Sequence, residues 1–190
     1  MNLEELRISL PDWARSLVVP SRLGTDAERM ALAIEVSRTN VSEGSGGPFG
    51  AIVVERGTGQ IVSIGMNLVV GQNNSMLHAE IVALMLAQRN EGRFDLSAGG
   101  TCQFELVTSC EPCAMCIGAI PWSGVSRVIC GASDKHARSA GFDEGIKPNN
   151  WIEEFSSRGI EVVLGVCGDE AAGVLRHYAA SGGTIYNSRS

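Results

Sequence analysis

Helical and strand patterns alternate along most of this chain, and the alternation constrains its fold more than any other feature. After residue 24 the patterns run helix, strand, strand, helix, strand, helix, strand, helix, strand, helix. A hairpin followed by alternating helices and strands is typical of a sheet that helices cover on both faces. We therefore expect an α/β fold, a three-layer α/β/α sandwich with a mixed sheet of roughly five strands.

Local signals place the individual elements. Thr25 or Asp26 caps a first helix, which the glycine-rich stretch 43–48 ends. The turn at 56–59 joins two apolar runs into a hairpin. Strands are expected at 51–55, 60–65, 104–107, 127–130 and 160–166, and later helices at about 78–89, from 112, at 150–158 and at 169–180.

Length and composition indicate one globular domain. The 190 residues suit a single domain, 1–190, with an N-terminal arm at 1–24 and a C-terminal tail at about 181–190. Hydrophobic residues make up 44% and charged residues 19%, which excludes the disordered class. The N-terminus lacks a signal-peptide pattern, and no apolar run is long enough to span a membrane. We expect a cytoplasmic protein with no membrane partner.

The formal net charge of −6 argues against binding to long nucleic acid. Proteins that bind phosphate backbones usually carry clustered basic residues. This chain has two lysines, Lys135 and Lys147, and its arginines are scattered. We expect a small neutral molecule as the partner.

Three of the six cysteines fall within seven residues, at Cys110, Cys113 and Cys116. Where thiols stay reduced, such clusters indicate metal binding or catalysis more often than disulfides. Cys113 and Cys116 are three residues apart, so a helix that begins near Pro112 places both sulfurs on one face. A helix start also favours the thiolate, which is the form that binds zinc. Cys110 precedes Pro112 and is expected to point elsewhere.

The triplet His78-Ala79-Glu80, at another expected helix start, supplies a third ligand and an acid. Structural zinc normally has four protein ligands, whereas catalytic zinc keeps one position for water. Glu80 can take a proton from such a water and pass it to a substrate. Each motif alone also occurs by chance, as a redox pair or as plain core. Together they favour catalysis that depends on Zn²⁺.

The motifs 78–80 and 112–116 resemble those of the cytidine deaminase-like superfamily of zinc hydrolases. Four further stretches are similar to its guanine deaminase branch, at 47–51, 108–113, 118–122 and 141–145. The resemblance implies a zinc-dependent aminohydrolase that converts guanine to xanthine and ammonia, with amino-triazines such as ammeline as further candidate substrates. The alternatives are cytosine, guanosine or tRNA adenosine as the substrate, or a zinc-stabilised binding module without turnover.

The resemblance also implies roles for individual residues. Zinc would be held by His78, Cys113 and Cys116. Glu80 would shuttle protons, and Glu144 would help the amine to leave. The substrate would contact Phe49, Asn67, the backbone at Ala79, Trp122 and Tyr186. Judged by residue type alone, Asn67 is better explained as a strand-end turn residue and Glu144 as part of a solvated turn. Phe49 and Trp122, taken alone, are more often ordinary core residues.

Similar enzymes form dimers in which a C-terminal segment closes the pocket of its own or the partner subunit. We therefore expect a homodimer, with exchange of the C-terminal segment as one option. Tyr186 is the aromatic residue available for that closure.

Overall fold

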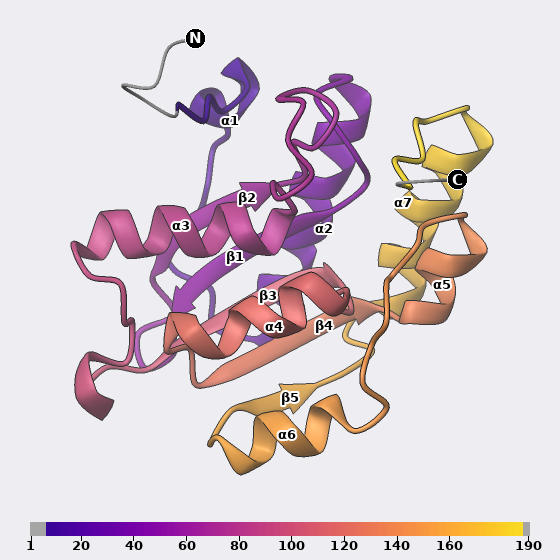
Figure 1. Ribbon diagram of the computed structural model, residues 1–190. Helices are drawn as coiled ribbons and strands as arrows, with labels where there is room; N and C mark the ends of the chain where they lie inside the picture. The colour runs from indigo at the N-terminus through magenta and orange to yellow at the C-terminus, as the bar shows by residue number, and fades with distance from the viewer. Residues whose placement is uncertain (1–6, 188–190) are drawn as a thin grey trace, which may run out of the picture.

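The structure is a computed structural model that describes residues 7–187. Its centre is a five-stranded sheet in the order β2-β1-β3-β4-β5 (Figure 1). The strands are β1 (Gly50–Glu55), β2 (Ile61–Met66), β3 (Phe104–Cys110), β4 (Arg127–Ala132) and β5 (Glu161–Val163). β1 pairs antiparallel with both β2 and β3, whereas β3, β4 and β5 run parallel. The prediction of a mixed sheet with about five strands is confirmed.

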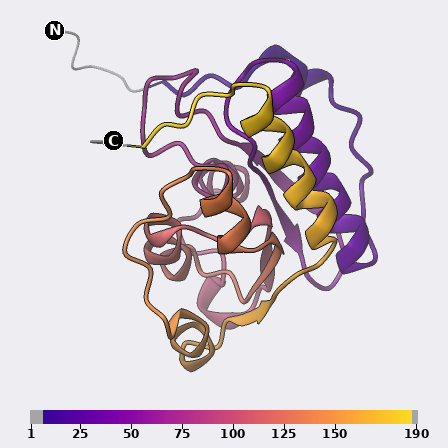
Figure 2. The same ribbon diagram turned by 90° about the vertical axis from the view of Figure 1, so that its right-hand side faces the viewer.

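Helices cover both faces of this sheet, which confirms the three-layer arrangement. The helices are α1 (Asp12–Ser16), α2 (Asp26–Ser42), α3 (Ala79–Glu91), α4 (Ala114–Ser123), α5 (Asp134–Ser139), α6 (Trp151–Ser157) and α7 (Gly168–Ala180), with a 3-10 turn η1 (Ala98–Gly100). α2 and α7 lie side by side on one face (Figure 2). α3, α4 and α6 pack against the other face.

The strands alternate their side chains between two cores. In β1, Ile52 and Val54 pack with α2 and α7, whereas Ala51 and Val53 pack with α3 and α4. This is the two-residue period of a strand. Every residue of β3 is buried, as expected for a central strand covered on both faces.

Three short elements, α1, η1 and α5, were not predicted. They have too few residues to show a period, and their positions depend on packing against the larger elements. β5 is also shorter than the predicted 160–166, because the chain turns at Gly165, where φ is +75°.

The described part of the expected N-terminal arm lies against the domain. Leu10, Trp13 and Leu17 pack on a cluster that includes Met66 and Leu77. The indole N–H of Trp13 also donates a hydrogen bond to Ser45 Oγ at 3.0 Å. The helices among residues 7–187 include none that is both long and apolar enough to cross a membrane.

Candidate active site

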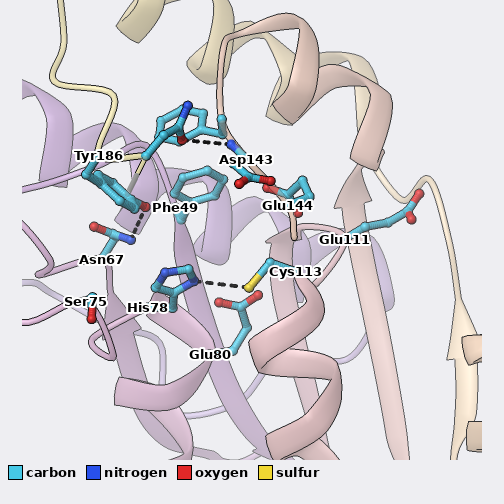
Figure 3. A pocket seen from close by; sticks show the side chains of 12 residues that line it. Phe49, Asn67, Ser75, His78, Glu80, Glu111, Cys113, Asp143, Glu144 and Tyr186 are labelled. Carbon is cyan, nitrogen blue, oxygen red and sulfur yellow. Dashed lines mark hydrogen bonds between the residues drawn. The ribbon is translucent and has the colours of Figure 1, made fainter. Parts of the chain in front are cut away.

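Two helix starts meet at one end of the sheet and bring the predicted metal ligands together. His78 is the N-cap residue of α3, and Cys113 is the N-cap residue of α4. Figure 3 shows His78, Glu80 and Cys113 converging from these two helices. Cys116 lies one turn into α4, on the same side as Cys113.

The spacing of the three ligand atoms suits one tetrahedral ion. His78 Nδ1 lies 3.4 Å from the sulfur of Cys113 and 3.8 Å from that of Cys116. All three atoms lie within 4.8 Å of one another. Zinc bonds of about 2.0 Å to nitrogen and about 2.3 Å to sulfur imply a nitrogen–sulfur spacing of about 3.5 Å in a tetrahedron. The residues therefore fit zinc, the ion predicted from the motifs, with little movement.

The electrostatics of the centre favour one preformed sulfur anion. A hydrogen bond from Cys116, together with the neighbouring His78, lowers the pKa of Cys113 to about 4 against the opposing effect of burial. The same sulfur–sulfur hydrogen bond, together with burial, raises the pKa of Cys116 well above its usual value. Binding of zinc by both sulfurs would therefore release a proton from Cys116. Cys110 is buried and contacts the carbonyl oxygen of Ser133 at 3.8 Å, away from the ligand group.

Glu80 lies beside the metal ligands and is almost completely buried. Burial, and then the negative charge of Cys113, raise the pKa of its carboxyl to about 7. An acid with a pKa near 7 can both accept and return a proton at neutral pH. This position and this pKa suit the shuttle role that the motif predicted.

Glu144 reaches the same pocket from the connection between α5 and α6, and it is also buried. Burial, and then the charge of Cys113, raise the pKa of Glu144 to about 8. The N–H of Ala114, at the start of α4, donates a hydrogen bond to the carbonyl oxygen of Glu144 at 3.0 Å. Two acids with raised pKa values, from distant parts of the sequence, therefore face one cavity.

Asn67 is fixed with its amino group toward the pocket. Its side-chain oxygen accepts hydrogen bonds from the backbone N–H of Gly47 at 3.4 Å and of Val69 at 3.3 Å. Its Nδ2 donates to the hydroxyl of Tyr186 at 2.6 Å (Figure 3). The C-terminal segment therefore lies over the pocket of its own chain.

Aromatic rings close one side of a cavity of about 180 Å³. The rings of Phe49 and Phe142 meet edge to face with centroids 4.9 Å apart, and Phe142 meets Tyr186 in the same way at 5.5 Å. The lining residues that sequence analysis missed are Ser75, Glu111, Phe142, Asp143 and Asn187. Glu111 lies within the quoted stretch 108–113, and Phe142 and Asp143 lie within the stretch 141–145. No local pattern singled out Ser75 or Asn187.

Trp122 is not part of this cavity within the chain, contrary to the prediction of a substrate contact. Its side chain is 84% exposed and lines a different hollow. The reason is distance, because nine residues of helix separate it from Cys113, a rise of about 13 Å along the axis. The side chain of Ala79 is buried in the core, so only its backbone at the start of α3 remains for the predicted substrate contact.

Comparison with known proteins agrees with this geometry. Residues 24–132 match the family described as the cytidine and deoxycytidylate deaminase zinc-binding region. The match covers more than half of the chain and includes His78, Glu80, Cys113 and Cys116. The chain belongs to this family of zinc-binding deaminases.

Within the family, similarity to guanine deaminases is extensive. The solved structure of guanine deaminase from Nitrosomonas europaea is 42% identical, with a TM-score of 0.89 over 95% of this chain and 98% of that one. A structure of the protein NE0047 in complex with 2,6-diaminopurine is 43% identical, with a TM-score of 0.90 over 98% and 99%. Guanine deaminase from Bacillus subtilis is 38% identical over 112 residues, which cover 59% of this chain and 67% of that protein.

Proposed function

We propose that this protein is a zinc-dependent guanine deaminase, which converts guanine and water to xanthine and ammonia. The observation that carries the proposal is the pair of buried acids, Glu80 and Glu144, beside a three-ligand metal centre. Hydrolysis of a ring amine must deliver one proton to the ring nitrogen and another to the departing amine. The near full-length similarity to a guanine deaminase supports the choice of substrate.

The donor set supports zinc as the cofactor. One imidazole and two sulfurs provide three protein ligands, the number typical of catalytic sites. When bound, zinc would acidify a water molecule, so that hydroxide is available near neutral pH.

The two acids divide the proton transfers. Glu80, with a pKa of about 7, can take a proton and return it to the ring nitrogen of the base. Glu144, with a pKa of about 8, is mostly protonated at neutral pH and is suited to protonate the departing amine. Glu80 therefore takes up and returns a proton during each turnover, whereas Glu144 begins each turnover in its protonated form.

The remaining pocket residues suit a flat heterocycle with acceptor atoms on its edge. Phe49 and Phe142 offer apolar rings, and Asn67 presents hydrogen-bond donors, since its oxygen already accepts from the backbone. The hydroxyl of Tyr186 accepts from Asn67, which frees its own proton for the substrate. Asp143 adds negative charge to the lining, which opposes a phosphate backbone and disfavours a tRNA substrate.

Ammonia release from a panel of amino-heterocycles tests the proposal. We expect guanine to be the best substrate among guanine, ammeline, cytosine, guanosine and adenosine. Zinc-loaded protein that favours another panel member would refute guanine as the substrate. Zinc-loaded protein that releases no ammonia from any of them would instead favour a binding module.

We also propose a homodimer through the outer face of α4. This helix has no charged residue, yet it leaves Trp122 exposed beside the equally exposed Phe94. Both line a hollow of about 830 Å³ between α4, α6 and residues 94–103. A protruding aromatic side chain and an apolar hollow on one face suit a two-fold contact between identical copies. The C-terminal segment closes its own pocket, so this dimer needs no exchange of that segment.

Light scattering after gel filtration tests the dimer. We expect twice the chain mass for the unmodified protein and Trp122→Glu to be monomeric. The control is Val18→Glu, which adds the same charge at another highly exposed apolar position. A monomeric unmodified protein would exclude this interface.

We further place the enzyme in the cytoplasm, because its six free thiols suit a reducing compartment.

A further inference from the structure

Lys147 is a nearly buried lysine next to the pocket. Its side chain is 9% exposed, and its ammonium lies 3.3 Å from Glu111 Oε2 and 3.3 Å from Asp134 Oδ1. It also lies 5.5 Å from the ring centroid of Trp151. Lysine is rarely buried unless it is paired, and a buried pair needs accurate geometry to offset the loss of hydration. The chain therefore holds this ammonium in a defined place.

The two carboxylates that bind Lys147 belong to the framework of the site. Glu111 lies between β3 and α4, two residues before the metal ligand Cys113. Asp134 is the first residue of α5, directly after β4. Lys147 itself lies in the segment 141–150, which connects α5 to α6. Its ion pairs therefore fasten this connecting segment to the ends of two central strands.

The connecting segment has no helix or strand of its own and makes a tight turn after Glu144. The N–H of Lys147 donates to the carbonyl oxygen of Gly145 at 3.1 Å, and the N–H of Gly145 donates to Asp143 Oδ1 at 2.9 Å. Gly145 has a φ of +70°, which favours glycine. Only this turn separates Glu144 from Lys147, so a shift of Lys147 would be transmitted to Glu144.

We propose that Lys147 is a positioning residue for Glu144. Its ammonium fixes the segment 141–150 to Glu111 and Asp134 and thereby holds the Glu144 carboxyl in the pocket. Lys147 does not line the cavity, so it acts through Glu144 and not on the substrate. The inference rests on the proposed function, because it assumes that Glu144 takes part in turnover.

Replacement of the ammonium should lower kcat more than it changes KM. A misplacement of about 1 Å can cost about 100-fold in rate, so we expect Lys147→Met to lose about 10-fold to 100-fold in kcat. KM for guanine should change by less than about threefold, since Phe49 and Asn67 remain in place. Lys147→Arg should recover part of the loss, because it restores a cation. Lys135→Met, at the exposed second lysine, is the matched control and should have unchanged kinetics.

A double-mutant cycle separates positioning from a general structural effect. In an enzyme that already carries Glu144→Gln, the addition of Lys147→Met should lower kcat by less than about twofold, because the carboxyl that Lys147 positions is already lost. An equal loss in both backgrounds would overturn the proposal. If Lys147→Met does not fold, Lys147→Gln replaces it, since the amide keeps hydrogen bonding without the charge.

Backbone amide hydrogen exchange of residues 141–150 tests whether Lys147 holds this segment in place, and it does not depend on enzyme activity. We expect faster exchange of this segment in Lys147→Met than in Lys135→Met, with equal zinc content in both. A lack of guanine turnover by the unmodified protein would refute the proposed function, while exchange would still test Lys147. Unchanged exchange and unchanged kcat in an active Lys147→Met enzyme would refute the role of Lys147 alone.

Discussion

The two ends of β3 bury carboxyl groups in opposite ways. At its start, Glu105 is fully buried and pairs with Arg29 and Arg127. Beyond its other end, Glu80 and Glu144 are buried beside the proposed metal ligands. Within residues 7–187, neither of these two acids has a lysine or arginine within ion-pair distance.

The contrast shows how one fold can bury a carboxyl group with arginine partners at one place and without them at another. A buried carboxyl group that forms ion pairs with two arginines, as Glu105 does, acts as part of the framework. Burial without such a partner favours the protonated form, which raises the pKa of Glu80 to about 7 and that of Glu144 to about 8. Perturbed acids in a cavity are typical of functional sites.

The largest effect should follow from removal of a metal ligand. Cys113→Ala leaves two protein ligands, so we expect loss of bound zinc and a fall in guanine turnover of at least about 10⁴-fold, because the ion is what makes hydroxide available near neutral pH. Metal analysis and ammonia release check both. The matched control is Cys130→Ala, at a buried cysteine outside the ligand group. Full zinc content in Cys113→Ala would exclude the proposed ligand set.

Replacement of Glu80, the proposed shuttle acid, should remove most turnover but keep the metal. We expect Glu80→Gln to lower kcat by about 10²-fold to 10⁴-fold, the usual contribution of a general acid–base group. Zinc content should stay close to that of the unmodified enzyme, and the melting temperature should not fall, since a buried carboxyl with a raised pKa lowers the stability of the fold at neutral pH. Retention of normal kcat would refute the shuttle role of Glu80.

At Glu105, near the start of β3, we expect a replacement to lower stability and to leave turnover unchanged. Glu105→Gln leaves Arg29 without its buried partner, so we expect a loss of about 3 kcal/mol in the free energy of unfolding. Urea unfolding measures this loss, and kcat below the unfolding transition should be unchanged. A large fall in kcat with normal stability would contradict the assignment of Glu105 to the framework and of catalysis to the acids beyond the other end of β3.

The smallest effect concerns how the stability contributed by Asp26, which pairs with Arg127 near Glu105, changes with pH. Arg127 donates to Asp26 at 2.7 Å, and this hydrogen bond lowers the pKa of Asp26 below its ordinary 3.8. A lowered pKa contributes stability above the unfolded-state pKa and loses it as the pH falls through the folded-state pKa. Asp26→Asn should therefore cost about 1 kcal/mol at pH 7, and the difference should shrink below about pH 4. A difference that persists unchanged at acid pH would show that it has another origin.

Local patterns made most of the fold and half of the site predictable. Strand and helix patterns predicted the five strands and the five longest helices, because all of these elements except β5 are long enough to repeat their pattern. The metal ligands were predictable since the i, i+3 spacing of Cys113 and Cys116 on a helix itself places two sulfurs on one face. The exposed position of Trp122 was not predicted, because a resemblance in sequence does not show how far along a helix the pocket extends.

The sequence by itself indicated the layer order, the proposed metal ligands and the acid beside them, because these features leave a local pattern in one helix, one strand or one short motif. Only the tertiary structure decided the rest of the pocket. Tyr186 meets Asn67 across 119 positions of sequence, and Lys147 meets Glu111 across 36. Burial, which sets the pKa values of Glu80 and Glu144, is likewise a property of the packed chain. Contacts of this length leave no period or spacing in the sequence, because they depend on how all the layers pack together.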